Sequence, residues 1–442
     1  MTGSAKLMNR RVYYDGLNLS LERGTGIATY TRTLAGVAGE LGYEIGLIYS
    51  SPHRSPTDPL LRDILFLDPK NSARISLQRG RYNWIFDQLR YLRSVPVGDH
   101  RLTGSVILDQ SHLNIPRHDH LFITRNLFNN ARDYFSWSGR FTEIAFDAPP
   151  DILHCTYQMP LRAKGARNIY TIHDLVPLRL PYATLDNKRQ TYRLLRKIAA
   201  EADHIVTVSE HSRRDIIELL GVDTARVTNT YESVDLPQEY IERSDDLVAE
   251  QLEVLWHLKK NGYLLFYGAF EPKKNVSRLI NAYLLSAVDI PLVIAGPPGW
   301  GTETEAALLK QMSEDDLLQR RSRRRFYRLE FVSRSLLATL IKGARAVLFP
   351  SLYEGFGLPV LEAMLLGTPV VTSRASSLPE IAGDAALYVD PYDTDAIAQA
   401  IKTITADDDL RTELVRRGRI QAELFSVARY RERVASLYER LG

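Results

Sequence analysis

The sequence predicts an α/β protein built from two Rossmann-like domains whose parallel sheets face one another across a cleft. Short β-branched and aromatic runs alternate with helical patterns along the chain, which is typical of strand–helix–strand units. With 442 residues, 45% of them hydrophobic and 25% charged, the chain is long enough for about two to three domains. The polar segment 236–257 separates two such series, so we expect domains at 1–240 and 258–425.

Strands are predicted wherever a short apolar run is rich in β-branched or aromatic residues. The first series lies at 12–14, 43–49, 152–155, 168–172, 205–208 and 227–230, and the second at 263–267, 292–295, 329–332, 346–349, 369–372 and 387–389. Ligands of such sheets bind at the carboxyl ends of the strands. The segments that follow these strands are therefore the first candidates for a site.

Composition excludes several classes of protein. The 56 basic and 53 acidic residues, a formal net charge of +3, are too balanced to indicate nucleic-acid binding. The single cysteine, Cys155, excludes internal disulfides and fits a reducing compartment. Residues 1–11 lack the apolar run of a secretory signal, and no stretch approaches the roughly twenty apolar residues of a spanning helix. We expect a cytoplasmic protein.

The segment between the predicted strands 346–349 and 369–372 reads as a glycine loop followed by a short helix. Pro359 suits the first helical position, and Gly367 suits the left-handed position after the last turn. Backbone N–H groups at the start of such a helix can hold a phosphate. The flanking carboxylates of Glu354 and Glu362 would repel a phosphate, so we expect them to accept hydrogen bonds from a sugar ring and a ribose diol. The pattern therefore predicts a nucleotide-sugar site.

The run E-G-F-G-L-P-x-x-E-A-M at 354–364, extended by G-T-P-V-V at 367–371 and L-P-E-I-A-G at 378–383, resembles the retaining family 4 glycosyltransferases of the GT-B fold. A bare Glu-x7-Glu carries no such information, because helix faces often present it. A simple connecting loop is the structural alternative, although it needs neither two glycines nor an aromatic residue at one turn. The resemblance implies that the cleft between the domains is the active site and that a last helix, within 426–442, crosses back to the first domain.

Further donor-binding residues are predicted in the second domain. Asn275 is predicted to cap the helix that begins at Val276, with Lys273 and Lys274 at its start, although two adjacent lysines also suit a plain surface. The resemblance implies that Lys274 contacts phosphate. Many relatives carry arginine after the glycine, where this chain has Ala269, so Lys273 is a candidate for that charge. The remaining donor-binding candidates are Gly268, Gly296, Val332, Ser333, Gly355, Phe356, Gly357 and Leu358.

The first domain offers two constellations that the resemblance places opposite the glycine loop. Gly24 and Gly26 precede a helix, where they would let the backbone approach the donor, although a simple tight turn explains them equally. His173 stands at a strand end and matches the family histidine that faces the transferred sugar, although a lone histidine is more often structural. With Lys274 and Glu354 it completes the predicted catalytic set. Ser209 is predicted to cap the following helix.

Acceptor contacts are predicted in the first domain. Aromatic rings pack on the C–H faces of sugars and arginine meets hydroxyls or lipid phosphate. The candidates are Tyr134, Phe135, Trp137 and Arg213, together with the aromatic segment 81–84. The alternative for the aromatic residues is that they pack a helix onto the sheet.

A divalent metal is not expected to take part. Asp393 and Asp395 have the letters of a D-x-D motif, but they precede a helical pattern and suit a cap with an acidic first turn. The segment 117–120 lacks a further spaced pair of metal ligands. Catalysis should therefore depend on helix starts and lysines, with the nucleotide sugar as substrate and no cofactor.

The resemblance further implies a retaining hexosyltransferase. The run G-x-x-E-P-K-K-N at 268–275 looks like a subgroup in which GDP-mannose and related donors are frequent, while UDP-sugars use the same scaffold. The expected acceptor is a saccharide or lipid-linked saccharide of a bacterial surface polysaccharide such as O-antigen. A basic pattern at 188–197 suggests peripheral association with the inner membrane, or equally a solvated helix face. An epimerase of the same fold and a non-catalytic nucleotide-sugar-binding scaffold remain alternatives.

Overall fold

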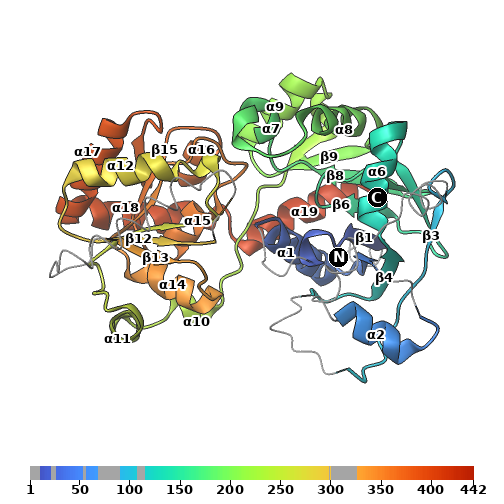
Figure 1. Cartoon of the computed structure of the whole chain (residues 1–442), viewed down its shortest axis with the longest axis horizontal. Helices are drawn as coiled ribbons and strands as arrows, with labels where there is room; N and C mark the ends of the chain where they lie inside the picture. The colour runs from blue at the N-terminus through green and yellow to red at the C-terminus, as the bar shows by residue number, and fades with distance from the viewer. Residues whose placement is uncertain are drawn as a thin grey trace, which may run out of the picture.

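The computed structural model describes residues 10–20, 26–52, 56–67, 90–106, 115–297, 299 and 326–442. Two lobes lie side by side, each with helices packed around a central sheet (Figure 1). The larger sheets have seven and six strands, and all their neighbouring pairs are parallel. The structure therefore has the predicted α/β class. Gly24 and the aromatic segment 81–84 lie outside the described residues.

The first sheet has the order β10-β9-β8-β6-β1-β2-β4. Its strands are β1 (Arg11–Asp15), β2 (Glu44–Ser51), β4 (His120–Arg125), β6 (Ile152–Cys155), β8 (Arg167–Thr171), β9 (His204–Thr207) and β10 (Val227–Asn229). On one side of β1 the chain adds β2 and then β4. On the other side it adds β6, β8, β9 and β10 in that order. The order thus reverses between β1 and β6. At such a switch point the loops diverge and leave a crevice at the carboxyl ends of the strands.

The second sheet repeats this logic with the order β13-β12-β11-β14-β15-β16. Its strands are β11 (Leu264–Tyr267), β12 (Leu292–Ala295), β13 (Phe326–Leu329), β14 (Ala346–Phe349), β15 (Val370–Ser373) and β16 (Ala386–Val389). The order reverses between β11 and β14. The loops at this switch point are the two that carry the predicted lysines and glutamates, so the topology alone brings them together.

Helices cover both sheets. Those of the first lobe are α1 (Gly26–Glu40), α2 (Pro59–Leu67), α6 (Leu127–Ser138), α7 (Val176–Arg179), α8 (Lys188–Glu201) and α9 (Glu210–Leu220). Those that follow are α10 (Gln238–Ile241), α11 (Asp245–Trp256), α12 (Val276–Ser286), α14 (Arg334–Gly343), α15 (Leu358–Leu365), α16 (Leu378–Ala382), α17 (Thr394–Ala406), α18 (Asp408–Glu423) and α19 (Val427–Leu441). The segment 236–257, expected to be a polar connection, contains α10 and α11, and α11 buries Val248 and Leu252 near Gly343 of α14.

Two features of the strands differ from the sequence-based expectation. A small parallel sheet of β3 (Val95–Val97), β5 (Thr142–Phe146) and β7 (Leu161–Ala163), like β4, is not predicted. The strand predicted at 329–332 is wrong in position, since β13 spans Phe326–Leu329. Ser333 already caps α14, and the Phe331 side chain is 79% exposed, so the chain has left the sheet by this point.

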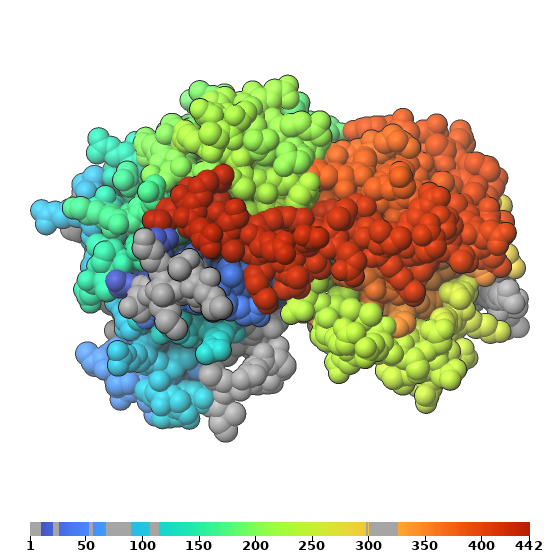
Figure 2. All heavy atoms as spheres, turned by 180° about the vertical axis from the view of Figure 1, so that it is seen from behind, coloured from blue at the N-terminus to red at the C-terminus, as the bar shows by residue number. Residues whose placement is uncertain are grey.

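The last helix ties the end of the chain to the first lobe. Figure 2 shows the C-terminal segment running from the second lobe across onto the first. The buried hydroxyl of Tyr438 on α19 lies 2.9 Å from the Tyr14 hydroxyl and 2.8 Å from His154 Nδ1. Burial lowers the pKa of His154 to about 3, so the ring is neutral and needs neutral partners. This network holds α19 against β1 and β6.

Tyr438→Phe should destabilise the fold, because it leaves His154 Nδ1 and the Tyr14 hydroxyl without a buried partner. The expected loss is about 1–3 kcal/mol of unfolding free energy, measurable by thermal or urea denaturation. Tyr43→Phe is the matched control: the Tyr43 ring packs against Tyr438, but its buried hydroxyl has no hydrogen-bond partner among the described residues. Equal effects of the two variants would contradict this account.

Candidate functional site

The glycine loop lies between β14 and α15 at the switch point of the second sheet. Gly357, with φ of 115°, occupies the N-cap of α15, which puts Pro359 at the second helical position rather than the predicted first. Gly367 has the predicted left-handed conformation, with φ of 75°. A side chain at Gly355 would bring its Cβ within 2.6 Å of the main-chain oxygen of His173. The glycine is therefore required by a close backbone approach between the two domains.

Lys274 and Glu354 form a largely buried ion pair at the base of this loop. Lys274 Nζ lies 2.6 Å from Glu354 Oε1 and 4.7 Å from the centre of the Phe349 ring. Burial raises the pKa of Glu354, but the ammonium groups of Lys274 and Lys273 outweigh it, so the net shift is downward. The carboxylate is therefore ionised at neutral pH and able to accept hydrogen bonds from a hydroxyl-bearing ligand.

Lys273 points to the first domain. Its Nζ lies 3.8 Å from Asp174 and 3.9 Å from Glu271, while its main-chain oxygen accepts from the N–H of Leu352 at 2.7 Å. Burial would lower the pKa of this lysine, but the carboxylates of Asp174, Glu354 and Glu271 raise it. The two loops of the second domain are thus joined by backbone, and both of their lysines bring positive charge to the cleft.

Glu362 lies on α15 beside Tyr267, the last residue of β11. Glu362 Oε2 is 3.0 Å from the Tyr267 hydroxyl, which is also 2.8 Å from the Pro359 carbonyl oxygen. Burial raises the pKa of Glu362, and the contacts with Tyr267 and Arg334 only partly oppose this. The sequence analysis missed Tyr267. Its position directly before Gly268, at the end of a switch-point strand, is the signal that could have indicated it.

Other predicted donor residues fall around the same edge of the sheet. Gly268 and Gly296 have φ of 132° and 147°, and a Cβ on Gly296 would come within 2.0 Å of the Gly268 oxygen. Gly26 at the start of α1 faces Leu358, whose side chain would lie 3.2 Å from a Cβ there. The structure therefore brings the glycines at the ends of β11 and β12 together, and separately brings Gly26 to the glycine loop.

The side chains of several predicted donor residues stabilise the fold of the second domain. Ser333 caps α14 by accepting from the N–H of Leu336, and the neighbouring Val332 is partly buried. The Phe356 ring is buried, with its centroid 5.5 Å from that of Phe425, so its backbone is the part suited to donor contact. Asn275 occupies the N-cap of α12, but its side chain makes no cap; it donates instead to the carbonyls of Pro350 and Pro391.

His173 closes the site from the first domain. It follows β8, with Nε2 2.9 Å from the Thr156 carbonyl oxygen and Nδ1 3.1 Å from Glu232 Oε1. His173 and Asp174 line a cavity of about 410 Å³ together with Glu271 and Lys273 of the second domain. The cavity is therefore built by both domains, at the carboxyl ends of both sheets. Glu232, which follows β10, is a second residue that the sequence analysis missed.

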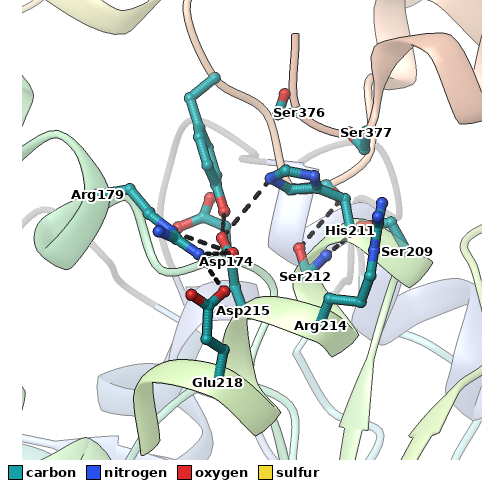
Figure 3. A network of polar contacts seen from close by, with 12 residues as sticks. Asp174, Arg179, Ser209, His211, Ser212, Arg214, Asp215, Glu218, Ser376 and Ser377 are labelled. Atoms are coloured by element: carbon teal, nitrogen blue, oxygen red, sulfur yellow. Dashed lines mark hydrogen bonds and ion pairs between the residues drawn. The ribbon is translucent and has the colours of Figure 1, made fainter.

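The two domains are held closed by contacts around the start of α9. Asp215 accepts from Arg179 Nε at 3.0 Å and from the Tyr353 hydroxyl of the glycine loop. The carboxylate of Glu380 on α16 accepts from the N–H groups of Glu210 and His211, where the helix dipole favours negative charge. Figure 3 shows Arg179, Asp215 and Glu218 turned toward one another. Ser209 caps α9, as predicted.

The acceptor assignments need correction. Tyr134 and Phe135 are buried, at 3% and 5% exposure, in the core of the first domain, so they cannot line an open cleft. They pack α6 onto the sheet, which was the alternative interpretation. Arg213 donates to the carbonyls of Val227 and Thr224 and thereby fastens α9 to β10. Trp137 is 51% exposed and stays an untested candidate.

Comparison with known proteins identifies relatives of both domains. The family model "Glycosyl transferases group 1" matches residues 250–421, and "Glycosyltransferase Family 4" matches residues 107–237. The O-antigen chain mannosyltransferase B of Escherichia coli is 37% identical over 282 residues, which span 61% of this chain and 69% of that protein. The serotype-specific mannosyltransferase WbdA of E. coli is 27% identical over 324 residues, but this match spans only 38% of that longer protein.

Among solved structures, Anabaena HepE in complex with UDP and glucose superposes with a TM-score of 0.64 at 15% identity, covering 98% of this chain and all of that one. Sucrose-phosphate synthase of Thermosynechococcus elongatus gives a TM-score of 0.65 at 16% identity, covering 98% and 99%. Such identities establish the fold alone. The fold is GT-B, and the protein is a glycosyltransferase. The chain belongs to glycosyltransferase family 4.

Within the described ranges no helix is long and apolar enough to cross a membrane.

Gly355→Ala should impair closure of the cleft, because the new methyl group would meet the His173 carbonyl at 2.6 Å. We expect a larger radius of gyration in solution scattering and a clear loss of transfer activity with both domains still folded. Gly36→Ala on α1 is the control, since a Cβ there meets nothing within 4 Å. An unchanged radius and full activity for Gly355→Ala would show that this contact does not govern closure.

Proposed function

We propose that this protein transfers a hexose, with retention of the anomeric configuration, from a nucleotide sugar to a saccharide or lipid-linked saccharide. GDP-mannose or a related GDP-sugar is the favoured donor, and synthesis of a cell-surface polysaccharide such as O-antigen in the cytoplasm is the proposed setting. The observation that carries the proposal is the convergence of two lysines and two glutamates at the switch point of the second sheet, opposite His173. The similarity to O-antigen chain mannosyltransferase B and to the serotype-specific mannosyltransferase WbdA supports the choice of sugar.

Each group at the site has a proposed task. Lys274 and Lys273, with the start of α15, are suited to the donor diphosphate, whose charge grows as the glycosyl bond breaks. Glu354 is suited to orient the sugar, and Glu362 to accept from the ribose hydroxyls. A double-displacement path needs a carboxylate nucleophile beside the anomeric carbon. Since Glu354 is already ion-paired and has the orienting role, we favour a front-face path in which the departing diphosphate takes the acceptor proton.

No divalent metal is assigned a part in this scheme, because the lysines and the helix start supply the positive charge that the leaving group requires. The UDP-bound state of the GT-B protein HepE shows that another base is compatible with the same architecture in that protein. The choice between GDP and UDP is left to the donor screen described below.

The acceptor side carries a feature suited to a lipid-linked substrate. Leu185 lines the cavity and is 73% exposed, and Tyr182, three positions earlier in the chain, is 64% exposed. The exposed Arg189 follows at the start of α8. Most other basic side chains of α8 bind within the domain, so the membrane-facing surface proposed here is this rim rather than the whole helix. Cosedimentation of the protein with anionic vesicles that is lost in Leu185→Ser would support this membrane-facing surface. An unaltered protein that does not bind the vesicles would contradict it.

The test of the donor assignment is a thermal-shift screen against GDP- and UDP-sugars, followed by turnover with saccharide acceptors in the presence of EDTA. We expect stabilisation by GDP-mannose and transfer that persists in the chelator. Interconversion of the donor without an acceptor would establish an epimerase instead. Donor binding without turnover would favour a scaffold, and activity abolished by EDTA and restored by manganese would overturn metal independence.

The two glutamates should have separable effects. Glu362→Ala should weaken binding of the free nucleotide diphosphate by about tenfold, the effect of losing one hydrogen bond worth about 1.5 kcal/mol. Glu354→Ala should spare the diphosphate and impair binding and turnover of the nucleotide sugar. Calorimetry with GDP and GDP-mannose measures both effects, and Glu330→Ala, on an exposed carboxylate, is the control. Equal losses of GDP affinity in the two variants would contradict the assigned roles.

A further inference from the structure

His173 meets a hydrogen-bond acceptor at each ring nitrogen. The Thr156 main-chain oxygen, 2.9 Å from Nε2, can only accept, so Nε2 carries a proton. The carboxylate of Glu232, 3.1 Å from Nδ1, is stable beside this nitrogen only if a second proton lies between them. Both ring nitrogens thus already have hydrogen-bond partners in the protein, and neither is left to remove a proton from a substrate.

The burial of Glu232 favours this contact with His173. Glu232 lies on the segment after β10 and is only 5% exposed, so its carboxyl group needs a hydrogen-bond partner within the protein. The imidazole of His173 supplies that partner at 3.1 Å. The Tyr30 ring meets His173 edge-on, with centroids 4.8 Å apart, and fixes the plane of the imidazole. Position and charge of the histidine are thus both determined by its neighbours.

We propose that Glu232 is a positioning residue that holds His173 as an imidazolium, so that the histidine contributes a fixed positive charge to the cleft and does not act as a general base. This inference rests on the proposed function for the part that His173 takes in transfer. The charge state of His173 is argued from the contacts around the ring and is measurable without a substrate.

The other charged and titratable groups around the ring do not cancel this effect. His154 on β6 is neutral, because burial lowers its pKa to about 3. Tyr30 on α1 is also neutral, since burial raises its pKa. Asp174 follows directly in the chain and is shared with Lys273 of the second domain. Burial alone would lower the pKa of His173, but the hydrogen bond and charge of Glu232 raise it above the ordinary value.

A permanent imidazolium constrains the chemistry. In transfer, the anomeric C–O bond to the diphosphate breaks, a new C–O bond forms to the acceptor hydroxyl, and the hydroxyl proton must leave. With both nitrogens of His173 protonated, this proton goes to the departing diphosphate oxygen. The histidine instead stabilises the negative charge that develops on the leaving group, as Lys274 does from the other domain.

Nitrogen-15 NMR of histidine-labelled protein tests the charge state directly. We expect both ring nitrogens of His173 to be protonated at neutral pH, with the signal assigned through loss in His173→Asn. Glu232→Gln should lower the pKa of His173, and Glu232→Asp, which keeps the charge, should keep that pKa closer to its value in the unaltered protein. A neutral His173 at pH 7 in the unaltered protein would overturn the proposal, whether or not either variant folds.

The pH profile of transfer supplies the second measurement. A group whose folded pKa is raised is protonated below that pKa, so kcat should be high at low pH and fall as the pH rises through it. In Glu232→Gln this fall should begin at lower pH, and a fall that begins about one pH unit earlier would reduce kcat about tenfold on the alkaline side. Glu239→Gln, an exposed carboxylate on α10, is the control. A profile that instead rises with pH through the titration of His173 would identify a general base and contradict the proposal.

A failure of GDP-mannose as donor would refute the proposed function while leaving the NMR result intact.

Discussion

The close approach of the glycine loop to the backbone of the first domain is the constraint on which the rest of the site depends. Because a Cβ on Gly355 would lie 2.6 Å from the His173 oxygen, the two domains meet at this point only without a side chain. That contact places Glu354 and Lys274 opposite His173 and closes a cavity lined by both sheets. The contacts of Tyr353 with Asp215 and of Glu380 with the start of α9 reinforce the same arrangement.

The charges in this closed cleft are balanced in a way that suits a diphosphate ligand. Lys274 pairs with Glu354, Lys273 with Asp174, and His173 with Glu232. Each pair sets a cationic group beside a carboxyl group in a partly or largely buried setting, where a lone charge would be costly. An entering diphosphate offers the lysines an alternative anionic partner. Glu354 would then be released toward the hydroxyls of the sugar, which couples donor binding to the orientation of its reacting end.

The sequence was sufficient for the fold class, the switch-point loops and the residues on them, because apolar runs and the glycine pattern are local signals. Prediction from the sequence failed where tertiary packing determines the role of a side chain. Tyr134 and Phe135 carry the same aromatic signal whether they bind a sugar or pack a helix, and only burial separates the two. Asn275 has the residue type of a cap, but two distant carbonyls compete for its amide. Tyr267 and Glu232 act through partners 95 and 59 positions away, which no local pattern reveals.

The most direct measurement is a crystal structure of the protein with GDP-mannose bound. The account predicts the diphosphate within hydrogen-bonding distance of Lys274 and the start of α15, the ribose on Glu362, and the hexose between Glu354 and His173 with the domains closed. A donor bound elsewhere, or one bound in the cleft while Lys274 remains paired with Glu354 and makes no phosphate contact, would contradict it.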